Sequence, residues 1–256
     1  MTTETAQTKP PDLDGVLRVG AARDVVTAIE RFSLDGSQSP ATAETDDMST
    51  RTREPGDLEG AGEAHTAAIA NAASFLEETL AAREDFVAAA LLAGHDGELV
   101  LYSQWKRGGD VPADLPAAWS LAPALADATR VDARTYEVDF TEPGTVSEVS
   151  RAATPHAHFG VFTVTPDTQR ELLDLAGRHG PTSMGTPGLT AINFHRSLDG
   201  RRVINLGLWT GFADFKALIS RPGFTGGEEY WTGVAGFRPH YFDVVAVVGN
   251  EKGTSA

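Results

Sequence analysis

The chain carries the same order of secondary-structure signals twice, and this repetition constrains its fold more than any other feature. In the second half, four segments have the apolar patterns of strands: 157–164, 190–196, 202–209 and 241–248. Thr165-Pro166-Asp167 is a typical helix start, and we expect the helix after it to end at Gly180. After the third strand, residues 212–219 and 228–234 are expected to be helical. The predicted order is therefore β-α-β-β-α-β.

The first half repeats this order with a weaker signal. Strands are expected at 25–32, 85–92, 99–105 and 131–140, and a helical stripe of apolar residues runs from Ile69 to Leu80. Residues 116–126 are expected to be helical, with a kink at Pro123. Trp105 and Trp209 take equivalent places, 104 positions apart (209 minus 105), which suits one repeat unit. We predict an α+β protein built from tandem ferredoxin-like repeats.

The same pattern sets the expected domain boundaries. Repeat 1 is predicted to cover 21–140 and repeat 2 to cover 156–250. The polar, acidic segment 33–63 is expected to be an insertion in repeat 1, and 141–155 a linker. The two ends, 1–20 and 251–256, are expected to be disordered.

Composition removes several classes of function. The net charge of −15, without a basic cluster, argues against binding to nucleic acid or to an anionic membrane. The absence of cysteine excludes disulfides, thiolate metal sites and a cysteine nucleophile. No signal peptide and no apolar run of about 20 residues is present, so a cytoplasmic protein is expected.

One hairpin of the second half carries the strongest functional motif. Its first strand contains Asn193 and His195, the chain turns at Asp199-Gly200, and the return strand contains Asn205-Leu-Gly-Leu-Trp209. Residues two apart on a strand share a face, so Asn205, Gly207 and Trp209 are expected to point the same way. We expect Gly207 to leave a gap between an amide and an indole, which would form a floor for a flat aromatic ligand.

This hairpin resembles that of the antibiotic-biosynthesis-monooxygenase family, in which an Asp-Gly turn leads into Asn-x-x-x-Trp. The first repeat has a partial version, Asp96-Gly97 to Trp105, with Leu101 in the place of Asn205. The resemblance implies oxidation of an aromatic molecule by O2 without metal or haem, with Asn205 and Trp209 binding substrate oxygens. The sequence departs from the family at Phe215, where a tyrosine is typical, and at Glu229, where a helix arginine is expected.

The double unit is similar to the ring-opening oxygenases of angucycline-type aromatic polyketide biosynthesis. That resemblance implies oxidative C–C cleavage with O2 and reduced flavin, FMN or FAD, which a separate flavin reductase would supply as a diffusible co-substrate. Such a role agrees with the absence of a G-x-G-x-x-G fingerprint. Single-unit members close a barrel by pairing two subunits, so two fused repeats are expected to form an intramolecular dimeric α/β-barrel as a monomer or a homodimer.

Further residues are assigned to the site by position. His195 is the candidate acid or base, beside the catalytic pair Asn205 and Trp209. The residues expected to line the substrate pocket come from both repeats: Tyr102, Gln104, Trp105, His158, Phe215, Tyr230 and Trp231. His156 and His158 form a His-x-His pair without a third ligand at a supporting spacing, so a metal site is not predicted there.

Three alternative functions remain open. The chain could be a cofactor-independent anthrone-type monooxygenase that forms a quinone, a polyketide cyclase, or a non-catalytic protein that binds an aromatic metabolite. A haem-degrading relative is excluded because 106–155 and 210–239 contain no histidine to ligate haem from a helix.

Overall fold

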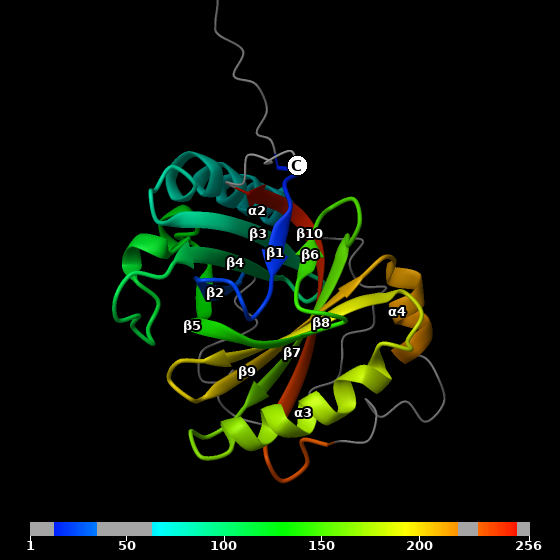
Figure 1. Cartoon of the computed structure of the whole chain (residues 1–256). Helices are drawn as coiled ribbons and strands as arrows, with labels where there is room; N and C mark the ends of the chain where they lie inside the picture. The colour runs from blue at the N-terminus through cyan, green and yellow to red at the C-terminus, as the bar shows by residue number, and fades with distance from the viewer. Residues whose placement is uncertain (1–12, 35–62, 220–229, 250–256) are drawn as a thin grey trace, which may run out of the picture.

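The computed structural model describes residues 13–34, 63–219 and 230–249, and its centre is a closed barrel (Figure 1). Around the barrel the strands follow the order β10-β3-β4-β2-β5-β8-β9-β7, and each neighbouring pair is antiparallel. The bounds are β2 Val25–Ser33, β3 Phe86–Gly94, β4 Glu98–Lys106, β5 Thr129–Glu142, β7 His156–Thr163, β8 Leu189–Ser197, β9 Arg202–Trp209 and β10 Gly236–Gly249.

Each half contributes four strands in the same arrangement. The first half runs β3-β4-β2-β5 and the second runs β8-β9-β7-β10, which is the strand order of a ferredoxin-like sheet in both cases. The halves join at two seams, where β5 pairs with β8 and β10 pairs with β3. The predicted tandem ferredoxin-like barrel is therefore confirmed, and closure within one chain leaves neither sheet with an open edge.

Strand alternation sorts the apolar side chains into three clusters. One cluster fills the barrel and includes Ile29, Phe159 and Leu206. The other two lie on the outer faces of the two half-sheets. In the first half the outer cluster packs under α2, and in the second half it packs under α3. The site discussed below lies on the outer face of the second half.

Among the described residues, the helices α2, α3 and α4 lie over these outer faces (Figure 1). Helix α2, Glu63–Phe75, continues into a π-helical turn, Leu76–Leu80, so the predicted apolar stripe is helical as expected. Helix α3, Gln169–Ser183, follows β7, and α4, Phe212–Ile219, follows β9. Helix α3 passes Gly180, where we expected it to end, because Gly180 does not adopt the positive φ by which a glycine ends a helix.

Two expected helices are replaced by turns. Residues 116–126 contain two short 3₁₀ turns, Ala117–Trp119 and Ala122–Ala124, because prolines at 116 and 123 break the hydrogen-bond ladder. Residues 230–234 form turns, and the remaining part of the expected helix, 228–229, lies outside the described residues.

The expected disordered N-terminus and linker contain a short ribbon. Strand β1, Leu17–Val19, pairs with β6, Ser147–Val149. The side chains of Leu17 and Val19 are fully buried in the barrel cluster. Most of the acidic insertion and the C-terminal tail lie outside the described residues. No described helix has the length and hydropathy to cross a membrane.

Candidate active site

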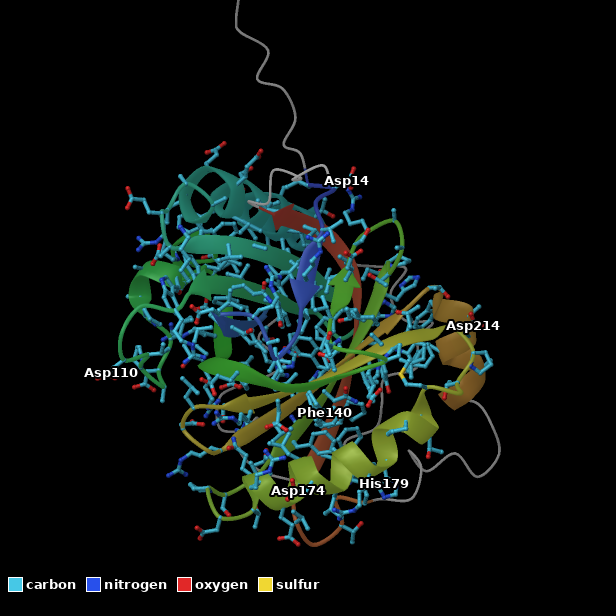
Figure 2. The ribbon with its side chains drawn as sticks, viewed as in Figure 1. Asp14, Asp110, Phe140, Asp174, His179 and Asp214 are labelled. Carbon is cyan, nitrogen blue, oxygen red and sulfur yellow. The ribbon has the colours of Figure 1, made fainter. Side chains whose placement is uncertain are left out.

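The outer face of the second half brings together residues from three neighbouring strands. On β9, Asn205, Gly207 and Trp209 alternate with the barrel-facing residues Leu206 and Leu208. Strand register places Gly160 of β7 opposite Asn205, His158 opposite Gly207 and His156 opposite Trp209. On the other side of β7, Tyr241 of β10 lies opposite His158 and Asp243 lies opposite His156. Figure 2 shows the helices beside this face, with Asp174 and His179 on α3 and Asp214 on α4.

The expected gap over Gly207 is filled by the chain itself. A Cβ atom on Gly207 would lie 2.0 Å from Cε1 and 2.4 Å from Nδ1 of His158, so the imidazole rests directly on the glycine. The prediction that this glycine leaves room for a ligand is therefore wrong. The sequence missed this contact because His158 and Gly207 come from different strands. Glycine is required here to admit the histidine ring.

Trp209 fixes the protonation pattern of that histidine. The indole Nε1–H of Trp209 donates to Nδ1 of His158 over 2.8 Å. Burial lowers the pKa of His158 to about 4, so the ring is neutral near pH 7. Since Nδ1 accepts, the single proton of the neutral ring is on Nε2. In the described part of the chain Nε2 has no acceptor, so His158 presents an unused N–H donor.

Aromatic side chains surround this pair. Phe215 of α4 meets Trp209 edge-on with ring centroids 5.2 Å apart, and it lies 4.2 Å from the ring of Tyr241. Burial raises the pKa of Tyr241, so its hydroxyl stays protonated. Phe215 takes the place of the family's tyrosine, and Tyr241 supplies a hydroxyl next to it from another strand. The predicted pocket residues His158 and Phe215 are thus brought together with Trp209.

Asn205 lies beside this group with an unused acceptor. Its Oδ1 is buried and has no hydrogen-bond partner in the described structure. The neighbouring position Gly160 is tightly packed, because a Cβ there would lie 3.0 Å from the ring of Phe237 and 3.5 Å from Cβ of Asn205. An unpaired buried acceptor costs about 1–3 kcal/mol, which a ligand O–H could recover.

A cleft opens at the other end of the same face. It has a volume of about 580 Å³ and is lined by residues of 163–168 and 231–236. Trp231 forms part of its wall, packs against Phe162 and Phe237, and has a buried indole N–H without a partner among the described residues. Tyr230 stacks on His179 of α3 at 5.0 Å. Of the two predicted pocket residues, Trp231 lines this cleft, and Tyr230 precedes it in the chain and packs edge-on against it.

Comparison with known proteins shows the family to which the chain belongs. No protein-family profile matches it. It is 33% identical over 90 residues to tetracenomycin-F1 monooxygenase of Streptomyces glaucescens, a match that covers 35% of this chain and 80% of that enzyme. The chain belongs to the antibiotic-biosynthesis-monooxygenase family.

Solved structures agree with this membership at the level of the fold. The structure of an anthrone oxidase-like protein superposes with a TM-score of 0.66 at 18% identity, covering 94% of this chain and all (100%) of that one. A structure from Fusobacterium nucleatum gives a TM-score of 0.53 at 7% identity and covers 90% of this chain and 96% of that one. Both structures therefore agree with the predicted fold.

Three predicted site residues of this family member lie on the opposite side of the sheet. His195, Tyr102 and Gln104 face the barrel interior, because each is one residue out of phase with the outer face. The Tyr102 hydroxyl donates to Nε2 of His195 at 2.8 Å, and Nδ1–H of His195 donates to the carbonyl of Asn193 at 3.0 Å. Burial lowers the pKa of His195 to about 4. His195 has both ring nitrogens bonded inside the barrel and does not join Asn205 and Trp209.

Trp105, the first-half counterpart of Trp209, is sealed. Its ring is fully buried and stacks on Trp119, with centroids 4.8 Å apart and planes 3° from parallel. Its Nε1–H donates to Ser103 Oγ of the same strand at 2.9 Å. Trp119 Nε1–H donates in turn to Asp85 at 2.9 Å. Both indole N–H groups are therefore hydrogen-bonded within the first half, and the substrate-binding role of Trp105 stays a prediction.

A carboxylate cluster at one end of the barrel has the donor atoms of a cation site. Asp96, Glu98 and His240 bring ligand atoms within 4.8 Å of one another. Arg31 already pairs with both oxygens of Glu98, and His240 Nδ1 lies 2.8 Å from Asp96. Burial favours a neutral Glu98, but Arg31 and His240 outweigh it and hold its pKa well below the usual range. The cluster is satisfied as an internal ion-pair network.

The sequence missed one polar group beside Trp209. Nδ1 of His156 lies 2.7 Å from Oδ1 of Asp243, and Nε2 of His95 lies 3.4 Å from the same oxygen. Asp243 is 87 residues from His156, so no local motif could reveal the pair. Only the strand register of β7 and β10, which sets these residues opposite each other, brings them together.

Proposed function

We propose that this protein is an oxygenase of polycyclic aromatic polyketide intermediates, and that the substrate reacts on the outer face of the second half. Family membership and the name of the tetracenomycin-F1 relative support the substrate class. The observation that carries the proposal within the structure is the neutral His158, held by Trp209 with its Nε2–H unused.

His158 would stabilise the negative charge that develops on the substrate. Removal of a proton from an anthrone-type carbon or a phenol leaves an electron-rich anion, whose charge gathers on a ring oxygen. The Nε2–H of His158 would donate to that oxygen in a buried setting, where such a bond is stronger than in water. The low pKa of His158 keeps it a neutral donor, so it does not trap the anion as an ion pair.

Asn205 would orient the substrate through a second oxygen. Its unpaired Oδ1 accepts a hydrogen bond, so it suits a phenolic O–H on the same molecule. His158 and Asn205 are diagonal neighbours on adjacent strands, at a Cβ separation of roughly 7 Å for such pairs. Donor and acceptor would then contact oxygens on different rings of one flat substrate.

The overall reaction needs no reductant when the substrate carries an activated CH2 group. One molecule of O2 converts the CH2 to a carbonyl, with one oxygen atom in the quinone-type product and the other in water. The four electrons come from the substrate, and O2 receives them. The protein's part is to hold the anion dry and oriented while O2 reacts.

Ring opening with reduced flavin stays a prediction of the double-unit resemblance. A flavin phosphate needs cationic or backbone N–H partners. The described lining of the cleft consists of threonine, glycine, alanine, valine and Trp231, without lysine or arginine. The described lining therefore offers no cationic partner for a flavin phosphate, and no step is assigned to flavin.

The test is turnover of 1,8-dihydroxyanthrone and tetracenomycin F1 by the purified chain in air. We expect O2 uptake and a product heavier by one oxygen and lighter by two hydrogens, without a flavin reductase. Strict dependence on a reductase, or a ring-opened product, would favour the flavin route. Loss of water without gain of oxygen would identify a cyclase. Tight binding without any turnover would identify a binding protein and contradict the proposal.

A further inference from the structure

The reaction proposed above needs a group that takes the substrate's proton, and His158 cannot do so. Its Nδ1 lone pair is engaged by Trp209, and burial lowers its pKa to about 4. Asn205 has no basic group. A base must therefore come from another residue near the same oxygen-binding groups.

His156 has the position of such a group. It lies two residues before His158 on β7, on the same outer face, and strand register sets it opposite Trp209. Phe212 of α4 covers it, with ring centroids 5.8 Å apart. The first half has Val26 at the equivalent place, opposite Trp105, so the group is peculiar to the half with the unused donor.

Asp243 gives His156 the tautomer opposite to that of His158. Burial alone would raise the pKa of Asp243, but the bonds from His95 and His156 outweigh it and lower the pKa, so Asp243 is a carboxylate. A carboxylate accepts, so Nδ1 of His156 carries the proton of the neutral ring, and its Nε2 has a free lone pair. The two histidines thus offer one acceptor and one donor side by side.

His156 is also open to solvent. The side chains of His156 and Asp243 are 26% and 50% exposed. A proton taken up by His156 can therefore pass to solvent. The charged and titratable groups that face His156 are Asp243 from β10 and, through that carboxylate, His95 from the turn after β3.

We propose that Nε2 of His156 is the general base of this enzyme, and that Asp243 is the residue that positions it. The proton moves from the substrate's activated C–H or O–H to Nε2. The bonding pair stays on the substrate as an enolate or phenolate, whose oxygen accepts the Nε2–H of His158. Dioxygen then oxidises that anion. This inference rests on the proposed function for its substrate class.

The experiment isolates proton removal from oxidation. Under anaerobic conditions in D2O, the enzyme's base exchanges the C10 hydrogens of 1,8-dihydroxyanthrone for deuterium, which ¹H NMR follows above the buffer rate. We expect His156→Gln to slow the enzymatic exchange by about 10²–10⁴-fold, the usual contribution of a general base. Binding, measured by quenching of tryptophan fluorescence, should change less than about threefold, because the remaining contacts are intact. His65→Gln on α2 of the first half is the matched control, and we expect wild-type exchange.

Asp243 is tested as a positioning residue. Asp243→Asn can donate to Nδ1 and so invert the tautomer of His156, and we expect exchange to fall at least about tenfold, as tautomer errors lower kcat. The apparent KM should stay constant, and Asp243→Glu should restore part of the rate.

Each outcome separates the two proposals. Exchange by wild type but not by His156→Gln supports the base, even if no oxidation follows in air, which would contradict the oxygenase proposal alone. Wild-type exchange by His156→Gln overturns the base and leaves the oxygenase proposal standing if oxidation occurs. Oxidation in air without any enzymatic exchange also overturns the base. Neither exchange nor oxidation of dihydroxyanthrone or tetracenomycin F1 contradicts both.

Discussion

The two halves of the barrel carry the same tryptophan in the same place and use it in different ways. In the first half, Trp105 donates to Ser103 of its own strand and is stacked under Trp119. In the second half, Gly207 replaces that serine, and Trp209 donates instead to His158 of the neighbouring strand. The register shows Ala28 in the first half where His158 stands in the second.

This difference shows how a duplicated sheet can be specialised by small changes. In the first half the indole bond ends at a serine that in turn faces the Ala28 carbonyl, so neither the indole N–H nor the serine hydroxyl is left for a ligand. In the second half the same bond leaves a histidine N–H unused. Asn205, in the place of Leu101, adds an unpaired acceptor. We therefore assign the proposed site to the second half, which carries these unused polar groups.

The largest expected effect follows from removal of the unused donor. His158→Phe fills a similar volume without an N–H, and we expect kcat/KM to fall by about 10²–10³-fold, as when one oxyanion donor is lost. Steady-state O2 uptake with dihydroxyanthrone measures it. Trp105→Phe is the control in the other half, and it should leave kcat/KM within about threefold. Equal losses in both variants would contradict the assignment of the site to the second half.

A smaller effect on activity is expected from alanine substitution at Gly207. The same substitution at its first-half counterpart Ser103, in a separate variant, is the comparison. The new Cβ of Gly207→Ala would lie 2.0 Å from the His158 ring, so the ring must move, and we expect about a 10–100-fold loss of activity. Ser103→Ala leaves the indole N–H of Trp105 without an acceptor, so it should lower the free energy of unfolding by about 1–3 kcal/mol and leave activity unchanged. Urea unfolding with activity assays of both variants checks the pair. An active Gly207→Ala enzyme would show that the His158 position is not needed.

Acid should lower the free energy of unfolding, partly because His158 takes up a proton when the chain unfolds. The pKa of His158 is about 4 in the folded chain and about 6.5 in the unfolded chain, so between these values the unfolded state binds more protons. The free energy of unfolding should therefore be fully retained above about pH 6.5 and fall as pH drops towards 4, by at most about 1.4 kcal/mol per pH unit for this group.

His195 contributes in the same direction and window, because burial lowers its pKa to about 4 as well. Urea unfolding at a series of pH values should show a shallower slope for His158→Gln and an unchanged slope for Trp105→Phe. An unchanged slope in His158→Gln would contradict the buried, neutral state of this ring.

The smallest effect is expected when Asn205 is replaced by leucine, the residue at its first-half counterpart Leu101. Asn205→Leu removes a buried acceptor without a partner, so we expect it to raise the free energy of unfolding by about 1 kcal/mol. The same variant should raise KM by about tenfold, since the proposed bond to a substrate hydroxyl is lost. Thermal unfolding and steady-state kinetics test the two parts. Unchanged KM would show that Asn205 does not contact the substrate.

The fold could be predicted from the sequence because it depends on local periodicity. Strand alternation, the Asp-Gly turns and the stripe ending at Leu80 each act over a few residues, and their repetition gave the ferredoxin-like order. The predicted helix at 116–126 was wrong because prolines 116 and 123 interrupt it. The short strand β1 was not predicted because its partner β6 lies about 130 residues away in the chain, as in the Arg18–Glu148 pair.

The site was harder to predict because it depends on which strands are neighbours. Alternation correctly placed Asn205 and Trp209 on one face, but His195, Tyr102 and Gln104 were assigned by nearness in sequence and face the barrel interior. The partners of Trp209 and His156 come from other strands, at separations of 51 and 87 residues. Such pairs follow from sheet register, which no local motif of this chain specifies.

The chain's four tryptophans allow the central claim to be tested in one spectrum. Two indoles belong to the first half, Trp105 and Trp119, and two to the second, Trp209 and Trp231. Their Nε1–H signals can be followed by ¹H–¹⁵N NMR as dihydroxyanthrone is added without oxygen, after assignment with Trp→Phe variants. We predict saturable shifts of Trp209 and Trp231, whereas Trp105 and Trp119 stay in place. Shifts of the first-half pair with Trp209 unmoved would contradict a site on the outer face of the second half.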